Sequence, residues 1–224
     1  MVPGTAFSAV AAGYAHLASP YKKFVPGTIR AAPFAAFIFF LAAFPDRPLL
    51  RGAVAALLLA LSWRHYVELR GVRLRGRELV ASGLVGIAVF VAWIALDNGE
   101  GAGFRPVAAA GGIEWPAAMA RIAILAAVVP VMEELFWRSF LMRWIDARDF
   151  LAVDARRVSR IALILSSALF ATEHSMWVAG LIAGLAFAGL YIKTNNLWAP
   201  LVAHSVTNAI LGTWILATGS WHLW

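Results

Sequence analysis

Two adjacent glutamates, Glu133 and Glu134, lie inside a long apolar stretch, and Arg138 follows four residues after the second. An ionised carboxylate at bilayer depth costs roughly 2.5–3.5 kcal/mol on insertion scales, so such residues usually have a function. Residues four apart share a helix face, so we expect Glu134 to pair with Arg138. Glu133 is rotated by about 100° and points elsewhere. The pattern predicts an ion pair beside a free base, although one ion-pair network without chemistry would fit it too.

Two more pairs of residues have the same spacing of four, and each contains a histidine. Phe170 and His174 end one apolar run, and His204 and Asn208 lie within the last run. A single histidine at the end of an apolar helix is more often a hydrogen-bonded structural residue. His204 and Asn208 can both donate hydrogen bonds while uncharged, and such a pair can also clamp two membrane helices together.

Together, these side chains could hydrolyse an amide with water. Glu133 would take a proton from water, His174 would hold that water and shuttle the proton, and His204 with Asn208 would donate hydrogen bonds to the oxyanion. We therefore predict these four as catalytic residues.

The composition places these residues in a membrane. The chain has 224 residues, of which 62% are hydrophobic and 14% charged, whereas a soluble domain has about 45–50% and 25%. Six to eight helices of about 20 residues would use the whole length. We expect an all-α, polytopic membrane helix bundle of about seven transmembrane helices, forming a single membrane domain over residues 1–224. Without cysteines, thiolate metal sites and disulfides are excluded.

The charges predict the orientation of the bundle. The net charge is +7, but the stacking and basic-patch patterns of nucleic-acid binding are missing, so we expect no nucleic-acid partner. Basic residues mark cytoplasmic loops instead. We therefore place the loops at 64–77 and 143–160 in the cytoplasm together with Lys22, Lys23 and Arg30, and the 97–115 loop on the other side. Residues 1–30 are expected to be an N-terminal interfacial or flexible segment.

Seven apolar runs are the candidate spans. They are Ala31–Phe44, Leu49–Tyr66, Leu79–Leu96, Pro116–Trp144, Ile161–Phe170, Val178–Ile192 and Leu197–Ala217. Pro116 suits a helix start, and Pro130 removes one backbone donor just before the glutamates, so a kink is expected there. His174 lies late in its run. To bring it to the depth of Glu133, we expect that helix to extend past Trp177, with a break near Gly180.

The three motifs resemble the signatures of a known family. Glu133-Glu134-x-x-x-Arg138, Phe170-x-x-x-His174 and His204-x-x-x-Asn208 look like the motifs of the CPBP family, which comprises CAAX prenyl endopeptidases of the Ras-converting type and bacteriocin-processing (Abi-type) membrane proteases. They occur in family order. The resemblance covers about residues 116–217, the expected catalytic core. The composition is also similar to that of the CAAX-protease-related proteins that accompany exosortase-type sorting systems.

The resemblance implies an intramembrane endopeptidase whose site opens to the cytoplasmic side. It implies Glu133 as base, His174 as its water-binding partner, and His204 with Asn208 as oxyanion hole. By motif position, the supporting residues would be Glu134, Arg138 and Phe170. The expected partners are the lipid bilayer and a membrane-anchored protein or peptide substrate, and the expected location is a bacterial cytoplasmic membrane. We expect no cofactor because the His-Glu-x-x-His zinc pattern is missing, although two histidines and a glutamate could form a three-ligand zinc site.

Two other functions fit the same residues. Buried glutamates and histidines relay protons in proton-coupled transporters, but the chain shows no inverted repeat and no matching pair of broken helices. A non-catalytic membrane scaffold of a sorting or immunity system would also retain the polar residues. Replacing Glu133 by Gln separates the three hypotheses, because only a protease loses cleavage of a partner.

Overall fold

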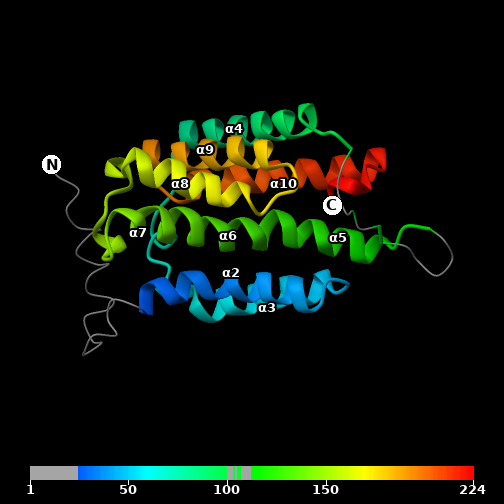
Figure 1. Ribbon diagram of the computed structural model, residues 1–224, viewed down its shortest axis with the longest axis horizontal. Helices are drawn as coiled ribbons and strands as arrows, with labels where there is room; N and C mark the ends of the chain where they lie inside the picture. The colour runs from blue at the N-terminus through cyan, green and yellow to red at the C-terminus, as the bar shows by residue number, and fades with distance from the viewer. Residues whose placement is uncertain (1–24, 100–102, 104, 107–111) are drawn as a thin grey trace.

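The computed structural model describes residues 25–99, 103, 105–106 and 112–224, and these residues form an all-α bundle (Figure 1). The expected fold class is confirmed. The helices are α2 (Val25–Ala43), α3 (Pro48–Ser62), α4 (Gly76–Ala95), α5 (Trp115–Ala123), α6 (Val129–Glu133), α7 (Met142–Asp146), α8 (Arg160–Ala171), α9 (Trp177–Thr194) and α10 (Trp198–Thr218). Two π-helical segments, η3 (Ile124–Val128) and η4 (Glu134–Leu141), join α5, α6 and α7 into one helix. Short 3-10 turns are η2 (Trp63–His65), η5 (Phe150–Ala152), η6 (Ala155–Arg157) and η7 (Trp221–Leu223).

The long helix α5–α7 lies in the middle of the bundle (Figure 1). The α2–α3 hairpin lies on one side of it, and α8, α9, α10 and α4 lie on the other. Helix α10 packs against α4, and α8 packs against α9. The long helix therefore contacts both groups, and its central residues face the interior.

Within the described ranges, five helices are long and apolar enough to cross a membrane: α2, α4, the continuous helix 115–146, α9 and α10. The protein is an integral membrane protein with several crossings. Helix α3 has 15 residues and α8 has 12. At 1.5 Å per residue, α8 is about 18 Å long, which is shorter than the ~30 Å hydrocarbon core.

The loops that carry most of the arginines meet at one end of the bundle, here called the basic end. Arg30, from α2, and Arg143, from α7, both bind Glu68 of the α3–α4 loop. In addition, Asn196 Nδ2 donates to the carbonyl of Arg73 at 3.3 Å. The loops predicted to share one side of the membrane thus lie together.

The predicted N-terminal segment 1–30 is only partly described. Residues 25–30 are helical and form the first turns of α2. Residues 1–24, which include Lys22 and Lys23, lie outside the described residues.

The turn between α8 and α9 corrects one expectation. Helix α8 ends at Ala171 and α9 begins at Trp177, so the helix does not extend past Trp177. Helix α9 returns to the basic end, where η6 packs against it and Arg143 lies 6.0 Å from the Tyr191 ring. The two helices form a hairpin that enters and leaves the bundle at the same end. A short α8 therefore places His174 at depth, in the turn.

Close helix contacts depend on two glycines. A Cβ on Gly86 of α4 would lie 2.4 Å from the carbonyl oxygen of Ala203 on α10. A Cβ on Gly180 of α9 would lie 3.1 Å from the Cα of Ala171 and 3.2 Å from Nδ1 of His174. Any larger residue at these positions would push α10 or the 172–176 turn outward, so the glycines help to position the polar side chains.

Candidate active site

The long helix changes its winding on both sides of Glu133. Residues 124–128 are π-helical, and the Val129 N–H bonds to the carbonyl of Ile124. Pro130 follows and has no N–H, so it cannot donate to the carbonyl of Leu125, five residues earlier. Asn208 of α10 takes that place, because its Nδ2 donates to the Leu125 oxygen at 2.8 Å. At Pro130, where a kink was expected, the helix changes its winding, and the side chain of Asn208 satisfies the carbonyl left without a donor.

The predicted ion pair is confirmed. Arg138 Nε lies 3.2 Å from Glu134 Oε2, and both side chains are buried. The guanidinium of Arg138 also lies over the Phe170 ring, 4.3 Å from its centroid. Because a cation over an aromatic face is stabilised by the ring quadrupole, Phe170 ties the first motif to the second. This contact fits the supporting role predicted for Phe170.

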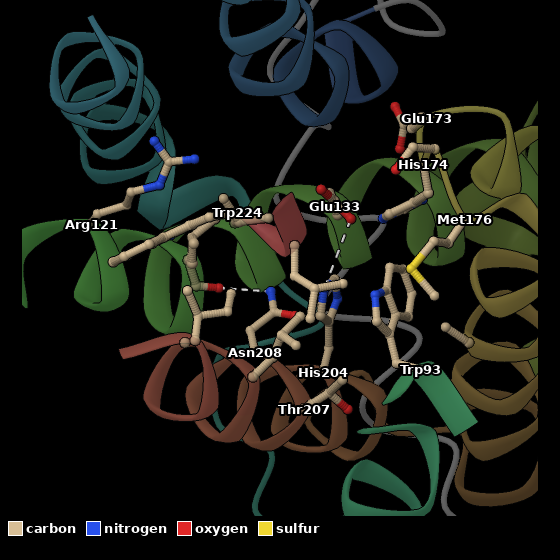
Figure 2. A pocket seen from close by; sticks show the side chains of 18 of the residues that line it. Trp93, Arg121, Glu133, Glu173, His174, Met176, His204, Thr207, Asn208 and Trp224 are labelled. Carbon is tan, nitrogen blue, oxygen red and sulfur yellow. Dashed lines mark hydrogen bonds and ion pairs between the residues drawn. The ribbon is translucent and has the colours of Figure 1, made fainter. Parts of the chain in front are cut away.

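His204 lies between the two glutamates. Its Nδ1 is 3.0 Å from Glu134 Oε1, and its Nε2 is 3.9 Å from Glu133 Oε2 (Figure 2). A carboxylate only accepts, so Nδ1 carries the proton and Nε2 faces Glu133. The ring stacks on Phe187 at 4.9 Å. Glu134 thus fixes the orientation of His204 by the same interaction network that holds Arg138.

Glu133 is held less closely, because His204 Nε2 lies 3.9 Å from its Oε2. Glu133 is 8% exposed. Its Oε2 is buried and has no hydrogen bond to any described residue. Buried polar atoms are nearly always hydrogen-bonded, and exceptions call for an explanation. Glu133 also faces the cavity described below, whereas Glu134 does not line it. Of the two adjacent carboxylates, one is held in an ion pair and the other is available to a reactant.

His174 approaches the same space from the α8–α9 turn. Its Nδ1 donates to the Phe170 carbonyl at 3.1 Å, which leaves Nε2 as the acceptor of the neutral ring. Trp93 and Phe170 pack against the ring at 5.2 and 4.8 Å. In Figure 2, the His174 side chain points toward Glu133. The four residues predicted as catalytic therefore lie close together, although they belong to the long helix, the α8–α9 turn and α10.

All four residues line one cavity of about 480 Å³. Its walls extend from Glu133 toward the end of the bundle opposite the basic end, and its other lining residues include Phe37, Leu41, Arg51, Trp93, Arg121, Leu211, Ile215 and Trp224. If the basic end is cytoplasmic, this position is the reverse of the cytoplasmic opening that the family resemblance implied.

Other polar side chains in the cavity were not predicted from the sequence. Glu173 lines it and accepts a hydrogen bond from Trp137 Nε1 at 3.1 Å. The sequence signal that could have indicated Glu173 as a site residue is its position directly before His174. Arg51 and Arg121 lie farther along the cavity, over the rings of Phe37 and Trp224. They are far apart in the sequence, so no local pattern joins them.

The described residues contain no group of three or more histidine, cysteine, aspartate or glutamate side chains arranged to hold a metal ion. Glu134 and His204 are bound to each other, and Arg138 adds a positive charge beside them. The chemistry proposed below uses no metal ion.

Comparisons with known proteins agree with the motifs. Residues 115–210 match a family model described as Rce1-like, type II CAAX prenyl endopeptidase Rce1-like. All three motifs lie inside this range, and the family indicated by the sequence is confirmed. The chain is thus a multi-pass membrane protein whose segment 115–210 is similar to the type II CAAX prenyl endopeptidase family. Neither the curated proteins nor the solved structures gave a match.

Proposed function

We propose that the protein is an intramembrane endopeptidase that hydrolyses a peptide bond of a membrane-anchored protein or peptide. The observation that carries this proposal is the carboxylate of Glu133, which is buried, lines a cavity and lacks a hydrogen-bond partner at Oε2 among the described residues. His204 and His174 flank the same space. A carboxylate in reach of water and a peptide carbonyl is the arrangement that general-base hydrolysis requires.

In the proposed reaction, Glu133 takes a proton from water as the water oxygen attacks the carbonyl carbon. His174 accepts a hydrogen bond from that water at Nε2 and orients it. The oxyanion receives hydrogen bonds from the second N–H of Asn208 and from His204 Nε2 in its doubly protonated form. The C–N bond then breaks, and the leaving nitrogen takes the proton from Glu133, either directly or through His174. The products are a new carboxylate and a new amine.

The experiment is a comparison of peptide termini by mass spectrometry in cells that carry wild-type protein or Glu133→Gln. A new C-terminus on a membrane-anchored protein should occur in the wild type and be absent in the variant. The matched control is Glu114→Gln, an exposed glutamate outside the cavity, which should cleave like the wild type. Identical termini in wild type and Glu133→Gln would support the scaffold hypothesis, and ion flux without a new terminus would support a transporter.

The proposed location is a bacterial cytoplasmic membrane, and the lipid bilayer is the expected surrounding. Exposed apolar side chains on α2, α4, α8 and α10 support contact with lipid, among them Phe39, Leu84 and Ile161.

A further inference from the structure

The cavity extends toward one end of the bundle only. Along α5–α7, its lining residues Arg121, Leu125, Val129 and Glu133 recur every fourth position, so they form one stripe on the helix. Glu133 lies at the inner end of this stripe, and Arg121 lies 12 residues nearer the outer end, or about 18 Å along the axis. The lining of α10 follows the same direction, from His204 to Ile215.

The far end of the cavity includes the segment after α10. His222, Leu223 and Trp224 line the cavity together with Gly103. His222 Nε2 lies 2.9 Å from Asp97 Oδ2, and the two side chains are 28% and 20% exposed. Trp224 stacks on Trp221 and covers Arg121. The ion pair between His222 and Asp97 is partly exposed, so it can break with a modest loss of stability.

The basic end is closed by a different kind of structure. Glu68 accepts hydrogen bonds from Arg30 Nη2 at 2.6 Å, from Arg143 Nη2 at 3.1 Å and from the Ser139 hydroxyl. Arg30 and Ser139 are fully buried. None of these four residues lines the cavity. This hydrogen-bonded charge cluster therefore links α2, the α3–α4 loop and the long helix at the basic end.

The distribution of charge assigns a side to each end. The basic end carries ten arginines in two loops: Arg64, Arg70, Arg73, Arg75, Arg77, Arg143, Arg148, Arg156, Arg157 and Arg160. At the other end, Arg47 and Arg105 are accompanied by Asp46, Asp97 and Glu114. An excess of arginine in short loops marks the cytoplasmic side of a membrane protein. The cavity consequently extends toward the non-cytoplasmic side.

We propose that the site admits its substrate from the non-cytoplasmic side of the membrane, so that the substrate class is a peptide segment exposed on that side. The claim that a peptide substrate enters the cavity rests on the proposed function. The side of the membrane from which it enters rests on the cavity and the charges alone. A cytoplasmic tail would have to pass the buried Arg30–Glu68–Arg143 cluster to reach Glu133. On the other side, the described residues that close the cavity include 222–224, which are partly exposed.

The chain has no cysteine, so single cysteines can report accessibility without background. The probe is a charged, membrane-impermeant maleimide, applied to right-side-out and inverted membrane vesicles. Leu211→Cys and Ser175→Cys report the cavity, which both residues line. Asn98→Cys and Arg148→Cys are exposed references for the two ends. Thr213→Cys, on α10 but outside the cavity, is the matched control.

Leu211→Cys and Ser175→Cys should be labelled in right-side-out vesicles, as Asn98→Cys is, and this labelling should be lost in inverted vesicles. Arg148→Cys should show the reverse, and Thr213→Cys should resist the reagent in both. Labelling of the cavity cysteines from the side of Arg148→Cys would overturn the proposal, as would equal labelling from both sides or none from either. The readout does not require cleavage, so it fails or succeeds independently of the proposed hydrolysis.

Discussion

Two buried carboxylates, Glu68 at the basic end and Glu133 at the cavity, have opposite surroundings. Glu68 binds two arginines and a serine hydroxyl. Glu133 has His204 Nε2 at 3.9 Å and an oxygen without a hydrogen bond from any described residue. Both are largely withdrawn from water, so both would be costly if left alone. The arginines and the serine offset the cost of burying the Glu68 carboxylate, whereas the cost of burying Glu133 is not offset in this way.

The difference separates groups that hold the fold from groups that are available for chemistry. Burial alone would raise the pKa of Glu68, but the charges of Arg30 and Arg143 and the hydrogen bonds from Arg30 and Ser139 lower it to about 2. Glu68 is therefore ionised under ordinary conditions and acts as a permanent link between α2, the α3–α4 loop and the long helix. An uncompensated carboxylate such as Glu133 does not stabilise the fold, and a functional role explains its presence.

The largest expected effect is on stability at the basic end. Glu68→Gln leaves two buried arginines without their counter-charge, which should cost about 3–5 kcal/mol of unfolding free energy. Thermal unfolding in detergent micelles measures the loss. Asp149→Asn, an exposed acid at the same end, is the control and should change little. A Glu68→Gln protein as stable as the wild type would show that the cluster does not hold the bundle together.

The second effect is the acid sensitivity of the same cluster. The folded pKa of Glu68 is about 2 and its ordinary value is 4.5. Because the pKa is lowered on folding, the stabilisation is present above 4.5 and is lost as pH falls toward 2, with a total of about 3 kcal/mol. Unfolding free energies measured between about pH 5 and pH 3 should show this slope in the wild type and a smaller one in Glu68→Gln. Equal slopes would contradict the assignment.

The third effect is on activity at the boundary between the two regions. Glu134 fixes the ring of His204 through Nδ1 and also pairs with Arg138. Partners that orient a metal-binding histidine contribute roughly 10- to 100-fold. We expect an effect of similar size for His204, so Glu134→Gln should lower the rate of appearance of the new terminus by about that factor. Glu114→Gln serves again as control. Unchanged cleavage would mean that His204 needs no orientation by Glu134.

The smallest effect concerns the hydrogen bond between Asn208 and the Leu125 carbonyl. Asn208→Ala removes the donor, and Pro130→Ala returns a backbone N–H to the same region. If Asn208 compensates for the proline, the stability cost of Asn208→Ala should be about 1 kcal/mol smaller in the Pro130→Ala background. Unfolding of the four proteins in this double-mutant cycle measures the coupling. If the stability costs of the two substitutions are additive, Asn208 does not compensate for Pro130, and its proposed role is only to donate to the oxyanion.

The sequence predicted the long spans well because a run of apolar residues about as long as the bilayer is thick has few other structural solutions. It also predicted the Glu134–Arg138 pair, because both residues lie on one helix. The α8–α9 hairpin was missed, since 12 apolar residues fit a short span as readily as a helix that turns back.

The charge cluster and the direction of the cavity could not be predicted from local patterns. Arg30 and Glu68 are 38 residues apart, and Glu68 and Arg143 are 75 apart. In the sequence, Arg30 counted only as a cytoplasmic marker. The cavity likewise combines residues of α2, α3, α5 and α10, whose proximity exists only after folding.

The most direct test of the account compares two readouts on Glu133→Gln. A general base contributes about 10²- to 10⁴-fold, so the new C-terminus should fall by that factor or disappear, while the unfolding temperature stays at or above that of the wild type. Persistent cleavage in Glu133→Gln would contradict the account. So would a loss of stability as large as that of Glu68→Gln, because Glu133 would then be a structural residue like its counterpart at the basic end.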